Sequence, residues 1–300
     1  KDTDRKAIQD EIDQLNTEID RVAETTKFNE IYLLKGDDGE KTINLNAHDA
    51  GLKGTLVDNG SGKATFTMKE LSVGDSVSIG GKNYTIGSTA ADAQKIVTGQ
   101  EKAGGKVTVN GVEYTYNDTD KKWKDAAGAD VQIGTGAAAG EIVIGDGDKV
   151  SDGTTTLTAM TDKKDATGAA KADGVDDNDN SVISAEKAYS LAKDELVAAN
   201  HIGDTENTAA VAQDTTNKNV FTITTGSAKV ANTLSFSLHV GADADMTNKI
   251  TVDIDTMNSA NLGIKGLNVT DKNGTAATYA IDAISDAISK VSSQRSALGA

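Results

Sequence analysis

Apolar residues near the start of the chain recur at the spacing of one helix face. They are separated alternately by four and three residues, as are the a and d positions of a coiled coil. Acidic and amide side chains fill most of the positions between them. The pattern predicts an amphipathic helix that ends near Thr25 and Thr26. The residues of its apolar stripe are Ile8, Ile12, Leu15, Ile19 and Val22.

A second stripe of this kind runs through residues 281–300, with Ser, Asp and Lys on the other face. Two stripes at opposite ends of one chain predict a stem in which the terminal helices pack together, with the rest of the chain inserted between them. The alternative is that each helix caps a small domain of its own. The pattern leaves the relative direction of the helices open. The residues of the second stripe are Ile281, Ile284, Ile288, Val291 and Leu298.

Between the two stripes the apolar period changes to two, as in β-strands. Residues 76–86 and 106–116 form an internal repeat in which a strand, a tight turn and an aromatic-led return strand follow one another. Gly80–Gly81 and Asn110–Gly111 supply the positive φ angles that two-residue hairpin turns require. We therefore expect two hairpins of one β-rich unit, with a short helix near 90–97 between them.

The remaining patterns complete an α+β multidomain prediction. Residues 184–199 favour a helix with Ser184 as N-cap, and 134–181 favour long loops with a small β element. Further strands are expected at 64–71, near 131, and at 220–224, 234–240 and 249–254. The predicted domains are a helical, coiled-coil-like stem with a β-hairpin from 1–50 and 232–300, a β-rich outer domain at 57–133, and a second variable outer segment at 134–231.

Composition removes several classes of function. Lys and Arg total 30 against 46 for Asp and Glu, which gives a net charge of −16. Such a chain repels nucleic acid and anionic lipid, because phosphate binding needs cationic side chains. The absence of Cys excludes disulfides and thiolate metal sites. No apolar run reaches the roughly 18 residues of a membrane span, so no membrane insertion is expected.

Two further features of composition bear on organisation and export. Hydrophobic residues make up 37% and aromatic residues 4%, which favours several thin modules over one thick core. The chain has no Pro, which suits a protein that is exported unfolded and folds quickly outside. No secretory signal opens the chain, and both ends look cut. We therefore expect a fragment of a longer protein.

Candidate chemistry is sparse. The histidines, His48, His201 and His239, are scattered, and none has a ligand partner at helical spacing. A zinc site or a catalytic triad would have to assemble from distant segments. Residues 134–140 are glycine-rich but lack the Lys-Ser/Thr of a phosphate-binding loop. We therefore expect no enzyme activity and no cofactor.

One loop approximates a calcium site. Asp176, Asn178 and Asn180 place oxygen side chains at alternating positions, as calcium loops require. Ser181 replaces the usual glycine, and the acid Glu186 comes one residue early. The alternative is an acidic loop that leads into a helix, whose N-terminal dipole favours nearby carboxylates.

Several segments resemble bacterial flagellins. Residues 15–29 are similar to the flagellin signature, residues 238–254 to a flagellin hairpin, and residues 281–300 to the returning helix of the family. The resemblance covers about 1–50 and 232–300, with departures at His239, Asp243 and Asp245. The positions that carry it include Asp20, Arg21, Phe28, Asn29, Gly241, Ala242, Leu262, Gly263 and Arg295.

The resemblance implies a structural subunit of the flagellar filament that gives motility by self-assembly with other flagellin subunits. It further implies a secreted, extracellular protein of the flagellum or cell surface, with exposed outer domains. The terminal helices through which flagellins polymerise are missing from 1–300, so we expect this chain alone to be monomeric. A host Toll-like receptor is an implied partner, with Glu11 and Arg295 near its surface; the alternative is that both are ordinary solvated or intersubunit charges.

A rival hypothesis is a cell-surface adhesin or polysaccharide-binding protein of the flagellin family. Aromatic faces stack on sugar rings, and lysines attract an acidic glycan. At alternate strand positions the same aromatic residues are also typical of a sheet core. The candidate residues are Tyr114, Tyr116, Lys121, Lys122 and Trp123.

Overall fold

The computed structural model describes residues 2–135, 141–239, 249–271 and 274–299. Contacts divide the chain into two compact units. Unit 1 comprises Lys1–Lys69 and Ala192–Ala300, and unit 2 comprises Glu70–Leu191. The protein has mixed helix and sheet content with several small sheets, which confirms the α+β class. Among the described residues, no helix has the length and apolar character needed to cross a membrane.

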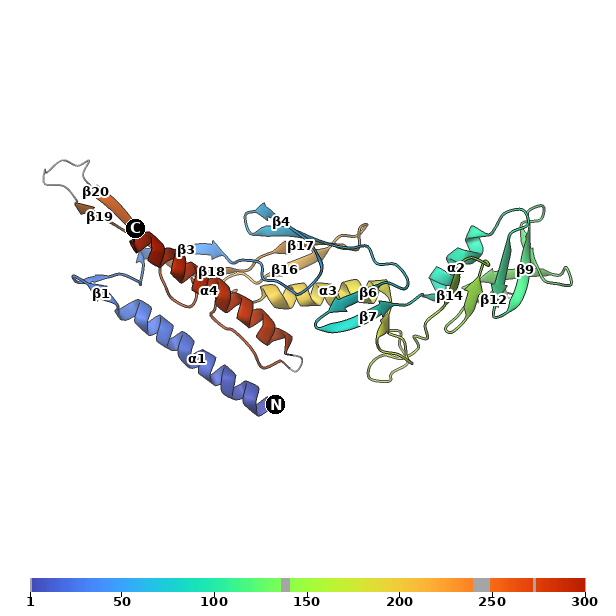
Figure 1. The fold of residues 1–300 in the computed structure, drawn as a ribbon, viewed down its shortest axis with the longest axis horizontal. Coiled ribbons are helices and arrows are strands. Elements are labelled where there is room, and N and C mark those ends of the chain that lie inside the picture. The colour runs from blue at the N-terminus through green and yellow to red at the C-terminus, as the bar shows by residue number, and fades with distance from the viewer. Residues whose placement is uncertain (1, 136–140, 240–248, 272–273, 300) are drawn as a thin grey trace. The chain divides into compact units, whose positions relative to one another are not determined.

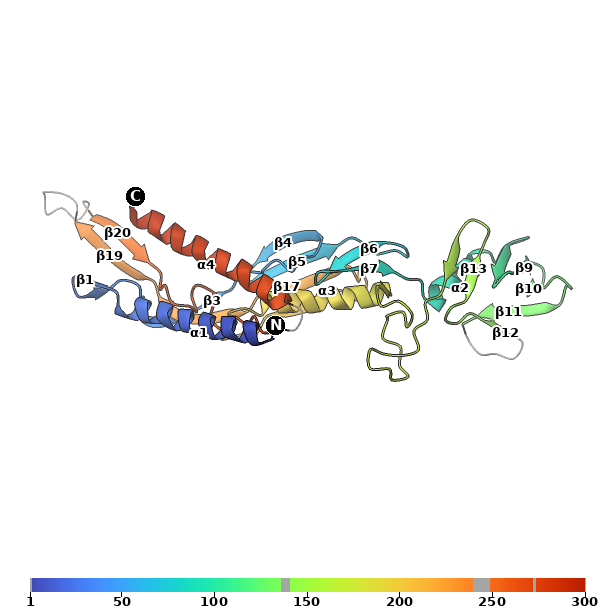
Figure 2. The same cartoon turned by 60° about the horizontal axis from the view of Figure 1, so that its bottom comes forward.

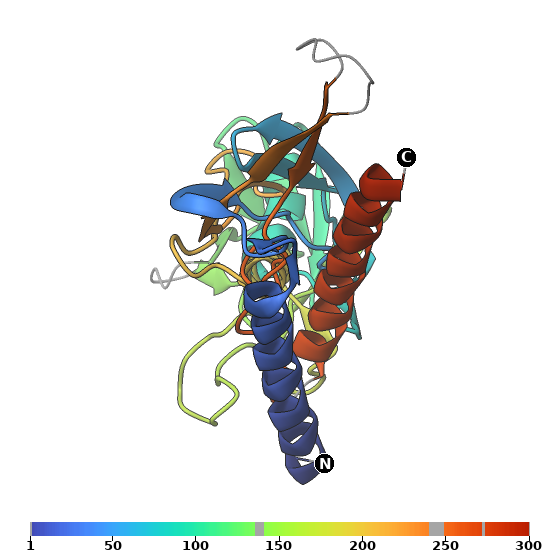
Figure 3. The same cartoon turned by 90° about the vertical axis from the view of Figure 1, so that its left-hand side faces the viewer.

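Unit 1 contains the two terminal helices, α1 (Asp2–Thr25) and α4 (Thr275–Gly299). Both predicted helices are confirmed, and α4 begins six residues before the first residue of its predicted stripe. The helices lie beside each other and run in the same direction (Figure 1, Figure 2). The end-on view in Figure 3 shows the same arrangement. The direction that the sequence pattern left open is therefore parallel.

In the described part of unit 1 there are also four small sheets, and all their pairings are antiparallel. The largest has the order β16 (Ala210–Gln213), β17 (Val220–Thr224), β5 (Lys63–Met68) and β4 (Gly54–Gly60). The three pairs are β18 (Ser227–Asn232) with β3 (Asp37–Asn44), β19 (Leu234–His239) with β20 (Lys249–Ile254), and β1 (Lys27–Phe28) with β2 (Ile31–Tyr32).

The largest sheet of unit 1 joins segments that the sequence patterns placed in different domains. Phe66 of β5 lies opposite Phe221 of β17, and both side chains are buried. Strands from 57–133 and 134–231 therefore share one sheet. The boundaries of the two units, near 69 and 191, differ from the predicted boundaries for this reason.

The described residues of unit 2 form two sheets and the helix α2 (Ala90–Gly99). Helix α3 (Ala185–Asn200) begins in this unit, and Ser184 accepts a hydrogen bond from the Lys187 amide, as predicted for its N-cap. The smaller sheet is β15 (Val182–Ile183), β7 (Lys82–Ile86) and β6 (Ser76–Ile79). The larger sheet is β12 (Glu141–Val143), β11 (Asp130–Gly134), β10 (Lys122–Lys124), β9 (Val112–Asn117), β8 (Lys106–Val109), β13 (Lys149–Ser151) and β14 (Thr156–Thr158).

Both predicted hairpins are present. Gly80–Gly81 and Asn110–Gly111 have positive φ at both turn positions, as two-residue turns of this kind require. The hairpins belong to different sheets, because β7 pairs with β15, whereas β8 pairs with β13 and β9 pairs with β10. The sequence repeat predicted the local motif, and both hairpins lie within unit 2.

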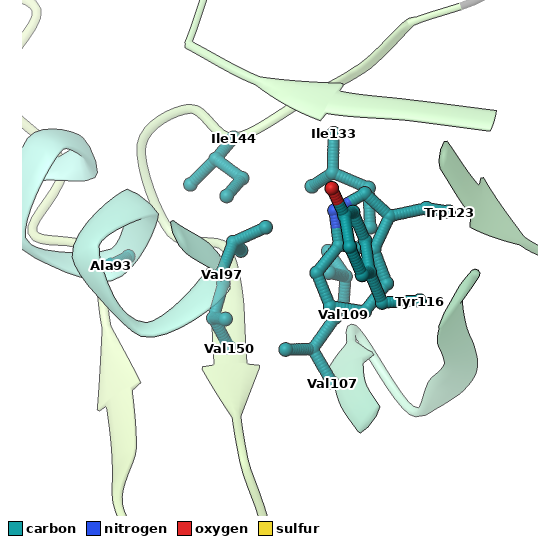
Figure 4. Packing of buried hydrophobic residues seen from close by; sticks show 9 residues of the cluster. All are labelled: Ala93, Val97, Val107, Val109, Tyr116, Trp123, Ile133, Ile144 and Val150. Atoms are coloured by element: carbon teal, nitrogen blue, oxygen red, sulfur yellow. The ribbon is translucent and has the colours of Figure 1, made fainter. Parts of the chain in front are cut away.

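The core of unit 2 is closed and apolar (Figure 4). Helix α2 begins with a capping box, in which Thr89 and Asp92 each bond the backbone N–H of the other, and it points Val97 toward the large sheet. Tyr116 and Trp123 meet edge to face, with ring centroids 5.2 Å apart, a favourable aromatic geometry. This packing fixes Tyr116 of β9 and Trp123 of β10 inside the unit.

Candidate assembly surface

Helix α1 holds the segment 259–271 through a row of polar side chains. Gln9 donates to the Leu267 carbonyl at 2.8 Å and accepts from the Val269 amide at 2.9 Å. Asp20 accepts from both the backbone amide and the hydroxyl of Ser259, at 2.7 and 3.0 Å. These side-chain hydrogen bonds satisfy the backbone groups of an irregular segment, as neighbouring strands do in a sheet. The other bonds of the row are Arg5 to the Asp271 carbonyl and Asn16 to the Ile264 carbonyl.

This polar row lies on one helix face because its members are spaced by four, seven and four residues. Sequence reasoning followed the apolar stripe and missed the row. The signal was present as long polar side chains at helical spacing. Pairing them with 259–271 required the fold, since that segment has no regular period of its own.

Helix α4 binds the same segment at Asn261, and binds the chain just before it at Asp253 and Asp255. Lys290 donates to the Asn261 carbonyl at 2.6 Å, and burial lowers the pKa of its ammonium group. Gln294 donates to the Asp253 carbonyl at 3.0 Å and accepts from the Asp255 amide at 3.3 Å. Segment 253–271 is thus tied to both terminal helices, which orders the helix pair.

An apolar cluster fills the space between the helices. The 257–269 segment supplies its large side chains, and α4 faces them with Ala280, Ala283 and Ala287. Small residues on the helix allow the segment to approach closely. From α1, Ile12 and Ile19 pack against the cluster while partly buried. The large side chains are Met257, Leu262, Ile264, Leu267 and Val269.

The predicted seam between the helices needs correction. Only Ile12 and Ile19 of the ten stripe residues pack in this cluster. The other eight are between 37% and 69% exposed, because the 257–269 segment occupies the space between α1 and α4 that they were expected to fill. They are Ile8, Leu15, Val22, Ile281, Ile284, Ile288, Val291 and Leu298. Exposed apolar rows of this size mark interaction surfaces in soluble proteins.

Three signature residues, Arg21, Phe28 and Asn29, lie at the end of α1 and in the β1–β2 hairpin that follows it. Arg21 forms an exposed ion pair with Glu18 at 2.5 Å. The Arg21 hydrogen bond lowers the pKa of Glu18. Asn29, with φ of 48°, lies in the two-residue turn that joins β1 to β2, and asparagine tolerates this conformation well. Phe28 is 65% exposed beside it.

The other signature positions fall in three places. Leu262 is buried in the cluster, and Gly263 has φ of 75°, which suits glycine in the tight turn of the held segment. Arg295 is exposed on α4, and Glu11, which is not a signature position but was expected near the receptor surface, is exposed on α1. Gly241 and Ala242 lie outside the described residues.

The proposed sugar platform is wrong for its central residues. Trp123 is 4% exposed and Tyr116 is 7% exposed, so neither ring offers a face to a ligand. The alternative interpretation as sheet core is confirmed. Lys122 instead forms an exposed ion pair with Asp130 at 2.5 Å.

In the acidic loop before α3, the carboxylate oxygens of Asp176 accept hydrogen bonds from backbone amides. Asp176 accepts from the amides of Asn178 and Asp179 through one oxygen and from the Thr161 amide through the other. Glu186 lies in the first turn of α3. This geometry accounts for Asp176 as a turn-capping residue, and calcium binding with Asn180 stays a prediction.

Comparison with known proteins gives matches to bacterial flagellins. Residues 1–38 match the family model of the bacterial flagellin N-terminal helical region. The flagellin of Clostridium tyrobutyricum is 56% identical over 48 residues, which cover 16% of this chain and 12% of the relative. The flagellin-like protein YvzB of Bacillus subtilis (strain 168) is 43% identical over 65 residues, covering 22% of this chain and 39% of the relative. Flagellin B of Vibrio cholerae O395 is 34% identical over 82 residues, covering 27% and 19%.

The matched family is one of structural proteins, which fits the expectation of a chain that is not an enzyme. More particularly, the matches support a bacterial flagellin and, with it, a structural filament of the flagellum that serves motility. The matched segments span at most 39% of these three relatives' own length.

Proposed function

We propose that this chain is part of a flagellar filament subunit that assembles with other flagellin subunits through the stem formed by α1 and α4. The observation that carries the proposal is the set of eight exposed apolar residues on two helices whose adjoining residues already pack against the 257–269 segment. The stripe lies partly within residues 1–38, the region that matches the flagellin model. The intact subunit is secreted and extracellular, and its inserted β-rich regions face the medium.

Energetics support a role for the stripe in assembly. Each fully buried large aliphatic side chain contributes roughly 1.5–3 kcal/mol relative to exposure. Eight such residues are exposed along two parallel helices, so burying them against neighbouring subunits would stabilise the assembly. The net charge of −16 keeps the outer surface soluble while neighbouring stems pack.

The direct test uses the bacterium that encodes the chain. Deleting the gene should remove filaments that react with an antibody against unit 2, and should reduce swimming. Restoring the gene should return both. Filaments of normal length and composition in the deletion strain, shown by electron microscopy and mass spectrometry of sheared filaments, would contradict the proposal.

Residues 1–300 alone are proposed to be monomeric, as the sequence predicts. Analytical ultracentrifugation checks this: a single slow species is expected at all concentrations, and concentration-dependent fibres would refute it. The resemblance also supports a host Toll-like receptor as a partner near Glu11 and Arg295. Charge reversal at both positions should then weaken receptor signalling, and unchanged signalling would assign them to solvent.

A further inference from the structure

A buried histidine meets two carboxylates in unit 1. The loop after β3 places His48 against α4, where its side chain is 5% exposed. The Nδ1 atom lies 3.1 Å from Asp282 Oδ2 and 3.5 Å from Asp286 Oδ2. The three ligand atoms all lie within 4.8 Å of one another. Imidazole and carboxylate are the ligand types that borderline divalent cations prefer.

The fold holds these groups in place without a ligand. Asp282 and Asp286 are four residues apart, so α4 presents both carboxylates on one face. The His48 backbone amide donates to Asn200 Oδ1 at 3.0 Å, and Asn200 is 1% exposed. The Asp49 amide donates to Asp282 Oδ2 at 3.2 Å. In metal sites, hydrogen bonds from surrounding groups orient the side chains that contact the metal.

The two distances from the His48 nitrogen suit a small cation. Metal–ligand bonds of about 2.0–2.2 Å place neighbouring ligand atoms roughly 3.0–3.5 Å apart in tetrahedral or octahedral geometry. Both separations from Nδ1 fall in this range. A cation could therefore enter with little movement of the imidazole.

The site also has room for further ligands. A cavity of about 450 Å³ is lined by all three residues, together with Leu52, Leu56 and Phe66 among others. The Asp282 and Asp286 side chains are 39% and 43% exposed, so ions can reach them. Water can complete the coordination shell that three protein ligands leave open.

We propose that His48, Asp282 and Asp286 form a binding site for a divalent cation of the Zn²⁺ class, which ties the 45–53 loop to α4. Neutral imidazole with two carboxylates carries a charge of −2, which such an ion neutralises. The nitrogen ligand disfavours Ca²⁺ and Mg²⁺, which take oxygen ligands. The site lies in unit 1 and does not depend on filament assembly.

Sequence reasoning required distant segments to build a metal site, and the fold supplies them. His48 follows the β3 strand, whereas both aspartates belong to the C-terminal helix. His201 provides a contrast, because its Nδ1 faces a single carboxylate, Asp204, at 3.0 Å. Among the residues that the structure describes, the His48 cluster is the only group of three or more such side chains with this convergence.

Calorimetry on the metal-free, EDTA-treated chain with ZnCl₂ at pH 7 tests the proposal. One zinc per chain is expected, with Asp286→Asn binding at least about tenfold more weakly. The matched control His201→Asn should bind as the wild type does. Ca²⁺ and Mg²⁺ should give no comparable heat. No zinc heat at millimolar concentration, or equal affinity in Asp286→Asn, would overturn the proposal and leave the cluster as an ion pair only.

A second measurement guards against variants that fail to fold. Asp286→Asn preserves the size of the side chain, so its circular dichroism and its metal-free melting temperature should match the wild type closely. Zinc should then raise the melting temperature of the wild type and of His201→Asn but not that of Asp286→Asn. An equal rise in all three proteins would show that zinc binds elsewhere, which would also overturn the proposal.

Discussion

The stem helices of unit 1 and the large sheet of unit 2 differ in how far their apolar side chains are buried. In unit 2, Val97, Val150 and Trp123 are between 0% and 4% exposed, and the core closes on itself. In unit 1, Ile281 and Ile288 of α4 remain 69% and 62% exposed, although the helix buries three alanines on its other face. Unit 2 therefore has the core of a self-contained fold, whereas the stem helices leave large apolar side chains exposed.

The largest expected effect tests the closed core. Trp123→Ala should destabilise unit 2 by about 3–5 kcal/mol, because it removes a buried indole and leaves a cavity beside Tyr116. Urea denaturation followed by circular dichroism measures the change. Trp123→Phe is the matched control and should cost much less, since it keeps an aromatic ring and loses an indole N–H that has no hydrogen-bond partner among the described atoms. Unchanged stability in Trp123→Ala would refute the closed core.

The two faces of α4 should respond differently to substitution. Ala283→Leu should cost about 1–3 kcal/mol, because Ala283 is 1% exposed and a larger side chain overpacks the contact with 257–269. Ile281→Ser should change the free energy of unfolding of the isolated chain by less than about 0.5 kcal/mol, as exposed positions do. Thermal unfolding of both variants checks this contrast, and an equal loss in both would show that the two faces are packed alike.

The smallest effect is electrostatic and concerns Asp255 of the held segment. A hydrogen bond from Thr233 lowers the pKa of this carboxyl; burial opposes the shift, and Lys41 adds to it. The lowered folded pKa means that Asp255 stabilises the fold above its unfolded pKa of about 3.9. That contribution is lost as the pH falls through the lower folded value. Stability of wild type and Asp255→Asn, compared from pH 6 to pH 2, should converge at the acid end, and a constant difference would contradict the assignment.

Local elements were predictable from the sequence because their signals are local. The stripe spacing predicted α1 and α4, and the Asn110–Gly111 turn predicted the hairpin of β8 and β9. Alternation also predicted β17 at its observed bounds. Each of these signals lies within a few residues of the element that it specifies.

Long-range arrangements were not predictable in this way. The pairing of β5 with β17 depends on residues far apart in the chain, and neither strand indicates its partner. The 257–269 segment packs between the helices, so most residues of the predicted seam are exposed. This insertion could not be predicted, because an irregular segment has no periodic sequence signal. The meeting of His48 with Asp282 depends on the same tertiary packing.

The central claim is that the exposed stripe of the stem serves subunit assembly. The most direct measurement is electron microscopy of filaments from bacteria that carry Ile281→Ser and Ile288→Ser in the intact protein. The account predicts that the double variant is exported, keeps the stability of the wild-type subunit, and forms few or no filaments. Filaments of normal number and length would contradict it.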